Sequence, residues 1–148
     1  RLAHLPLERN LDAGHVAIVG VVHLCRYQSN GRVRPLHQPH QHHRTKALFA
    51  DFVRSFGDAD VVILSEIYKV EGRVRAWHKD ISSKKLAEAI AEYWETDEDQ
   101  KREREMIYCD DLADMEAALR KGVKKGDVVI IMGAGDVDRV ARQLCQNS

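Results

Sequence analysis

The chain has 148 residues, the length of one domain, and carries 23 acidic and 23 basic side chains, so its net charge is zero with histidine neutral. This balance disfavours nucleic-acid-binding proteins, in which a basic excess is usual. The longest apolar run, at 16–22, is far shorter than the roughly 20 residues of a membrane span. Three scattered cysteines without a CxxC pair indicate a reducing compartment. We therefore expect a cytoplasmic protein that contacts neither nucleic acid nor membrane.

Three segments in the first half of the chain have strand patterns. Residues 15–22 read HVAIVGVV and residues 60–64 read DVVIL. Continuous β-branched runs of this kind are typical of strands buried on both faces of a parallel sheet. Residues 32–36 predict a short strand, with Pro35 at its end because proline cannot donate to a strand ladder. Residues 1–14 have no regular pattern.

Helix patterns alternate with the strand patterns. Apolar side chains three to four positions apart predict helices over 44–56, 86–93, 112–119 and 137–144. Ser82 or Ser83 is a suitable N-cap for the second of these helices, and Asp110 or Asp111 for the third.

Two more strands complete the alternation. Residues 106–108 and 127–132 read MIY and DVVIIM. Regular alternation predicts an α/β fold: a Rossmann-like, mostly parallel sheet with helices on both faces. Ligands of such sheets bind beyond the carboxyl ends of the strands. The loops after Leu36 and Leu64, and the turn at 133–136, are therefore the expected ligand positions.

The densest group of chemistry-bearing side chains is HQPHQHHRT at 37–45. We expect this stretch to lie between a strand and a helix N-terminus, where anions are favoured. Arg44 can hold a carboxylate or phosphate by two parallel hydrogen bonds, and His40 can line the same site. Two alternatives stay open: a solvated polar loop, and a zinc site. The zinc ligands would come from His37, His40, His42 and His43, with Cys25, although no carboxylate or cysteine stands at ligand spacing inside the stretch.

The GAGD sequence at 133–136 follows a strand and precedes a helix. It has the first two glycines of the dinucleotide motif GxGxxG, but position 138 is aspartate. We therefore interpret it as a tight turn that needs glycine for its backbone conformation. The chain contains no P-loop GxxxxGK[ST] and no recognisable Ser-His-Asp order, so the catalytic residues are unknown at this stage.

Several stretches together carry a family resemblance, and the likeness covers about residues 31–146. The stretches are QPHQHHRTKALFADFV at 38–53, FGDADVVILSEIY at 56–68, ISSKKLAEAI at 81–90 and GDVVIIMGAGDVDRVA at 126–141. Together they resemble the C-terminal domain of the UDP-N-acetylmuramate–L-alanine ligases, in the Mur ligase family.

The resemblance implies an amino-acid-positioning domain of an ATP-dependent ligase of peptidoglycan precursor synthesis. In this family, a first domain binds the UDP-sugar and a central domain binds ATP and Mg²⁺. The muramoyl carboxylate is activated as an acyl phosphate, and the amine of L-alanine then attacks it. The isolated C-terminal domain is therefore expected to be inactive, and the chain, which begins without Met, to be a piece of a longer protein.

The resemblance also implies roles for individual residues. Arg44 would clamp the carboxylate of L-alanine, and His40 would line the same pocket. Gln41 stands where the family usually has arginine, a loss for which His43 could compensate in part. Structural turn residues near the site would be Gly133, Gly135 and Asp136.

The N-terminal part departs from the family. A His-Pro-Thr-Glu segment that usually precedes the QPH motif is absent. We therefore expect two parts: residues 1–30, a divergent segment that is either the first strand of the domain or a remnant, and residues 31–148, the Mur ligase C-terminal-like domain. The missing segment and Gln41 also support an alternative function, a degenerate non-catalytic binding module of the same fold.

Overall fold

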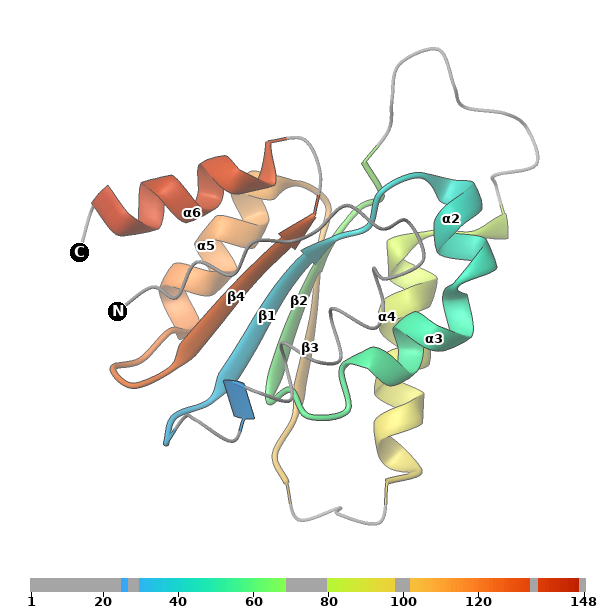
Figure 1. Cartoon of the computed structure of the whole chain (residues 1–148), viewed down its shortest axis with the longest axis horizontal. Helices are drawn as coiled ribbons and strands as arrows, with labels where there is room; N and C mark the ends of the chain where they lie inside the picture. The colour runs from blue at the N-terminus through green and yellow to red at the C-terminus, as the bar shows by residue number, and fades with distance from the viewer. Residues whose placement is uncertain (1–24, 27–29, 69–79, 98–101, 134–135, 147–148) are drawn as a thin grey trace.

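A computed structural model describes residues 25–26, 30–68, 80–97, 102–133 and 136–146 of the chain. Four parallel strands form one sheet in the order β3-β2-β1-β4 (Figure 1). The strands are β1 (Val33–Gln38), β2 (Val61–Ser65), β3 (Glu105–Cys109) and β4 (Val128–Gly133). This arrangement confirms the expected α/β fold with a parallel sheet.

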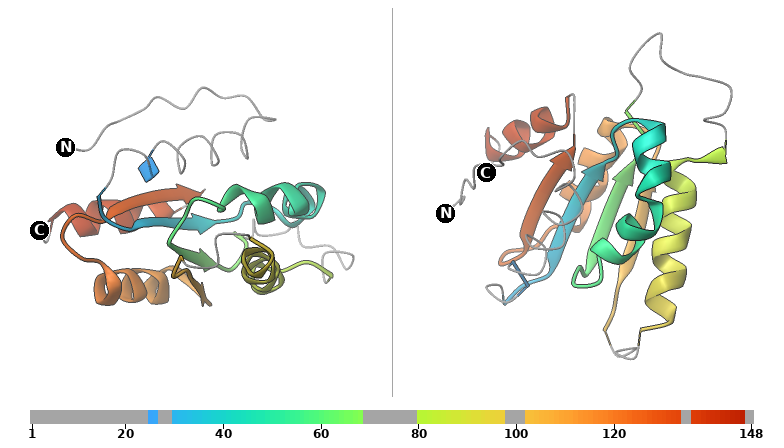
Figure 2. Two further views of the ribbon diagram at one scale, coloured as in Figure 1. Left: turned by 90° about the horizontal axis from the view of Figure 1, so that it is seen from below. Right: turned by 45° about the vertical axis from the view of Figure 1, so that its right-hand side comes forward.

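Helices cover both faces of the sheet. They are α2 (His42–Ala47), α3 (Phe49–Ser55), α4 (Ser83–Glu95), α5 (Leu112–Gly122) and α6 (Val137–Gln146). Figure 2 shows α4 and α5 on opposite sides of the half of the sheet formed by β2 and β3. Because the sheet is buried from both sides, its strands read as continuous apolar runs rather than as alternating ones.

The cores on the two faces follow from the alternation of side chains along each strand. Val62 and Leu64 of β2 face α3 and α4, where Phe52, Phe56, Leu86, Ile90 and Trp94 complete one apolar cluster. Val61 and Ile63 face the other way, where Leu36, Met115, Leu119 and Val140 form the second cluster.

Two helices begin where the sequence predicts. The side chain of Ser82 accepts a hydrogen bond from the backbone N–H of Lys85 (3.2 Å) at the start of α4. The side chain of Asp111 accepts one from the backbone N–H of Asp114 (2.9 Å) at the start of α5. Each cap satisfies a donor that the first helical turn leaves without a partner.

The single helix predicted over 44–56 is wrong in its start and in its continuity. Helical structure begins at His42, and Leu48 separates α2 from α3 with φ −105° and ψ 16°. The backbone N–H of Leu48 still donates to the carbonyl of Arg44 (3.0 Å), so the chain bends without losing its hydrogen bond. The apolar stripe runs through both helices, and it therefore gave no sign of the bend.

The strand predicted over 32–36 is longer, and Pro35 lies in its middle, opposite Ile130 of β4. The paired register of β1 with β2 begins only at Leu36. Proline is tolerated here because the pairing of β1 with β4 runs over all six residues and does not need its missing N–H.

A buried ion pair joins the start of β1 to the segment before β4. The Nε atom of Arg34 lies 2.5 Å from a carboxylate oxygen of Asp127, and both side chains are almost fully buried. Asp127 also accepts the backbone N–H groups of Arg32 (3.1 Å) and Lys124 (2.9 Å). Burial alone would raise the pKa of Asp127, but the Lys124 N–H and the Arg34 guanidinium hold it below the usual value.

Some sequence predictions lie outside the described residues. These are the strand over 15–22, the irregular segment 1–14 and the position of Gly135. Among the described helices, none is long and apolar enough to cross a membrane.

Candidate functional site

The order of the strands creates a topological switch point between β1 and β4. The chain passes from β1 to β2 and β3 on one side, and β4 then pairs on the opposite side of β1. At the carboxyl end of this pair His37 lies opposite Met132, and Gln38 lies opposite Gly133. The HQPHQHHRT stretch therefore leaves the sheet beside Gly133, the first residue of GAGD, at the edge where α/β proteins bind their ligands (Figure 1).

Gly133 is required by the close approach of these two strand ends. Its φ is +154°, and an added Cβ would lie 2.9 Å from the backbone oxygen and 3.0 Å from the Cβ of Gln38. No larger residue fits there without moving backbone. Asp136, which follows the turn, is exposed, and its carbonyl accepts the N–H of Arg139 (2.9 Å) at the start of α6. Within GAGD, the structure thus gives a packing reason for glycine at position 133.

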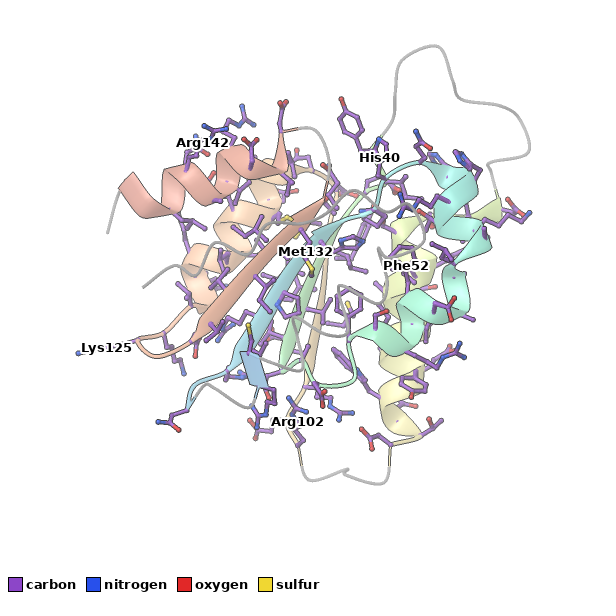
Figure 3. All side chains as sticks on the ribbon, viewed as in Figure 1. His40, Phe52, Arg102, Lys125, Met132 and Arg142 are labelled. Carbon is purple, nitrogen blue, oxygen red and sulfur yellow. The ribbon has the colours of Figure 1, made fainter. Side chains whose placement is uncertain are left out.

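His40 lies just beyond the carboxyl end of β1 (Figure 3). It forms an isolated parallel bridge with Tyr68, and the two rings are stacked with centroids 5.8 Å apart and an interplanar angle of 23°. Burial lowers the pKa of His40, and the neighbouring charges of Arg44 and His43 lower it further. The imidazole is therefore neutral near pH 7, with one ring nitrogen able to donate a hydrogen bond and the other able to accept one.

Gln41 connects β1 to α2 with an unusual backbone conformation. It has φ 64° and ψ 126°, and it is the one non-glycine residue with positive φ in the described part of the chain. Its carbonyl oxygen accepts both the N–H (3.1 Å) and the Oγ1 hydroxyl (3.0 Å) of the buried Thr45. Strained residues of this kind persist only when the surroundings hold them, and they often occur at binding sites.

Arg44 is half-buried in the last turn of α2, and His43 is exposed at the beginning of the same helix. The helix has only six residues, so its dipole contributes little to anion binding. The helix N-terminus is therefore a weaker reason to expect an anion here than the sequence indicated. The argument for an anion at this place depends on the Arg44 guanidinium.

His37 does not join the other histidines. It lies inside β1, and its ring packs in the core 5.5 Å from the ring of Phe52 and 6.0 Å from that of Phe56. Within the described ranges, no three His, Cys, Asp or Glu side chains are grouped so that they could hold a metal ion. A zinc site that includes His37 would therefore need a ligand whose ring packs in the apolar core.

Sequence reasoning missed a group of residues at the carboxyl ends of β2 and β3. Glu66 accepts the backbone N–H groups of Ile67 (2.7 Å) and Ser83 (3.4 Å) with one oxygen and the hydroxyl of Tyr108 (3.0 Å) with the other. Burial raises the pKa of Tyr108, and Glu66 and Asp110 raise it further. The strand-end rule did indicate the loop after Leu64, but no local motif distinguishes Glu66 or Tyr68 within it.

Comparison with known proteins finds relatives named UDP-N-acetylmuramate–L-alanine ligase. No family model matches the chain. UDP-N-acetylmuramate–L-alanine ligase of Synechococcus elongatus is 34% identical over 113 residues, which are 76% of this chain and 21% of the relative. The proteins of the same name from Cereibacter sphaeroides and Sorangium cellulosum are 32% and 33% identical over 90% and 95% of this chain, and 26% of each relative is covered. The chain thus spans 21 to 26% of the length of these relatives.

A solved structure has a similar fold. It is a domain assigned to a UDP-N-acetylmuramate:L-alanyl-γ-D-glutamyl-meso-diaminopimelate ligase of Haemophilus ducreyi. The TM-score is 0.56 with 17% identity, over 90% of this chain and 82% of that one. At this identity the likeness supports the fold.

The parallel sheet with helices on both faces defines a Rossmann-like α/β domain. The chain belongs to the Mur ligase family, and it corresponds to the C-terminal domain of the UDP-N-acetylmuramate–L-alanine ligases.

Proposed function

We propose that this chain is the amino-acid-positioning domain of an ATP-dependent UDP-N-acetylmuramate–L-alanine ligase of peptidoglycan precursor synthesis. The observation that carries the proposal is the pairing of Gln38 with Gly133, which brings the HQPHQHHRT and GAGD segments to one edge of the sheet. The names of the relatives supply the substrates, UDP-N-acetylmuramate and L-alanine.

The task of the domain in this reaction is to orient L-alanine. The muramoyl carboxylate reacts with ATP to give an acyl phosphate, the amine of L-alanine attacks its carbonyl carbon, and phosphate leaves as the amide forms. Arg44 binds the L-alanine carboxylate through two parallel hydrogen bonds, and neutral His40 forms a further wall of the pocket. Holding the amine and the acyl group together lowers the activation barrier by several kcal/mol, because the entropy of bringing them together is lost on binding and not in the reaction.

ATP and Mg²⁺ are bound mainly by the central domain that the family places before this one. Among the described residues, no three His, Cys, Asp or Glu side chains are grouped as metal ligands. The partners of the domain are the central and N-terminal domains of the ligase, and its place is the cytoplasm, where nucleotide-linked precursors and ATP are available.

The alternative is a degenerate binding module of the same fold. Gln41 supports it, because the family usually has arginine at this position and one cation is therefore missing beside the pocket. In this alternative the switch point would still bind an amino acid, but no amide would form.

The test measures L-alanine-dependent ADP release with UDP-N-acetylmuramate and MgATP, using this chain alone and fused to the first two domains of a related ligase. We expect activity only in the fusion. Arg44→Ala should raise the KM for L-alanine about 10- to 100-fold, because a hydrogen bond to a charged group contributes about 1.5–3 kcal/mol. Arg54→Ala is the matched control, since Arg54 is exposed on α3 and pairs with Asp51.

A folded but inactive fusion would support the binding module instead of the ligase. An active fusion whose KM does not change in Arg44→Ala would contradict the carboxylate clamp. Gln41→Arg restores the usual charge of the family, and in an active fusion it should lower the KM for L-alanine.

A further inference from the structure

We propose that Tyr68 is a positioning residue of the switch-point site, which holds the imidazole of His40 in its binding orientation. Only the effect of this residue on the reaction rests on the proposed function. The geometric part, that Tyr68 fixes His40, concerns the folded chain alone.

The backbone of Tyr68 is joined to the end of β1. Its N–H donates to the carbonyl of Pro39 (2.8 Å), and Tyr68 forms a parallel bridge with His40. This contact continues the pairing of β1 with β2 beyond the last residues of both strands. Tyr68 therefore cannot move away from the end of β1 without breaking a backbone hydrogen bond.

The segment before Tyr68 is held from the other side. The carboxylate of Glu66 accepts the N–H of Ile67 (2.7 Å) and the hydroxyl of Tyr108 (3.0 Å), and Ile67 itself is buried. These contacts tie the loop to β3 and to its own core. Tyr68 thus approaches His40 from a fixed backbone rather than from a free loop.

The ring of Tyr68 lies over the ring of His40. A centroid distance of 5.8 Å at 23° is within the range of offset-stacked aromatic pairs. Such a pair restricts the rotation of the imidazole and covers one of its faces. Arg44 and His43, both in α2, are the charged or titratable neighbours that act on the same ring.

The first experiment follows the titration of His40 by NMR in this chain, with the signal assigned by comparison with His40→Gln. Tyr68→Leu keeps apolar bulk but removes the flat ring, and Tyr68→Phe keeps the ring. We expect Tyr68→Leu to move the pKa of His40 upward, toward the ordinary value of about 6.5, because burial of the imidazole decreases. Tyr68→Phe should titrate like the wild type. Tyr93→Leu is the control, since Tyr93 is exposed on α4.

The second experiment uses the ligase fusion. Tyr68→Leu should raise the KM for L-alanine about two- to tenfold, which is the equilibrium effect of losing one aromatic pair. The KM for ATP should not change, and Tyr68→Phe should restore the KM for L-alanine.

The outcomes separate the two ideas. An unchanged His40 titration in a folded Tyr68→Leu chain would overturn the positioning role, whatever the fusion does. An active fusion in which Tyr68→Leu has the wild-type KM would overturn its effect on the reaction, while the ligase function would stand. A wild-type fusion without L-alanine-dependent ADP release would instead refute the ligase function, and the titration would still decide the role of Tyr68.

Discussion

Replacing His37 by leucine should remove much of the pH dependence of folding between pH 7.5 and pH 4.5. The imidazole is buried in β1 between Phe52 and Phe56, and neither of its nitrogens has a hydrogen-bond partner in the described structure. Leucine is similar in size and has no polar atom, so the surrounding core can accept it with little strain.

The magnitude follows from the pKa of His37. Burial is the largest cause and lowers this pKa to about 4, while the backbone of Met132 acts in the opposite direction. In the unfolded chain the value is about 6.5. Between these two pH values the unfolded state binds more protons, so the wild type is fully stabilised above pH 6.5 and loses stability as the pH falls toward 4. At about 1.36 kcal/mol for each pKa unit, the complete loss is roughly 3 kcal/mol.

The assay is urea unfolding over this pH range, monitored by circular dichroism. The free energies of unfolding are compared only where the m-values are equal. His37→Leu should be at least as stable as the wild type at pH 7.5, because an unpaired buried polar group costs about 1–3 kcal/mol. The exposed His43→Leu is the control, and it should change the free energy of unfolding by less than about 0.5 kcal/mol. If His37→Leu is clearly less stable at pH 7.5 and keeps the wild-type pH dependence, the reasoning is wrong and the ring makes a stabilising bond.

Two further substitutions test the strand ends. Gly133→Ala should destabilise the chain by about 1–3 kcal/mol, because the added Cβ would press on Gln38. Gly57→Ala is the control and should be nearly neutral, because the nearest atom lies 3.6 Å from the added Cβ. Equal melting temperatures for the two variants would contradict the packing argument. Asp127→Ala should cost about 3–5 kcal/mol in urea unfolding, because it leaves the buried Arg34 guanidinium without its carboxylate. The double variant Arg34→Met/Asp127→Leu should recover most of that loss, and no recovery would show that the backbone hydrogen bonds of Asp127 matter more than the ion pair.

Local signals were sufficient for most of the fold. The β-branched runs at 60–64 and 127–132 became β2 and β4, because a strand buried on both faces must be apolar on both sides. Ser82 and Asp111 cap α4 and α5 because each cap depends only on the next three residues. The alternation of strand and helix patterns predicted the parallel sheet, and the family stretches predicted the relatives.

Features that depend on distant parts of the chain were not predictable in the same way. Pro35 is acceptable inside β1 because of how β4 pairs with that strand, which no local pattern reveals. His37 was grouped with its neighbours in sequence, yet β1 extends past it and turns its ring into the core. Tyr68 meets His40 only because β2 lies beside β1 in the sheet.

The roles of Arg44, His40, Gln41 and His43 remain proposals. The structure gives their positions: His40 follows β1, Gln41 has a positive φ of 64°, and Arg44 lies in the last turn of α2. Substrate contacts depend on a ligand and on the other domains. No property of the separate segments could establish them.

The pairing of β1 with β4 also has a consequence for the order in which the domain folds. The contact between Arg32 and Asp127 spans 95 positions of the chain, so the switch point closes a far longer loop than the pairing of β1 with β2 does. Long loops cost more chain entropy and form late. A partly folded chain could therefore contain β1, β2 and β3 before its ligand crevice exists. A ligand that binds in the crevice would then stabilise the fully folded domain relative to such intermediates.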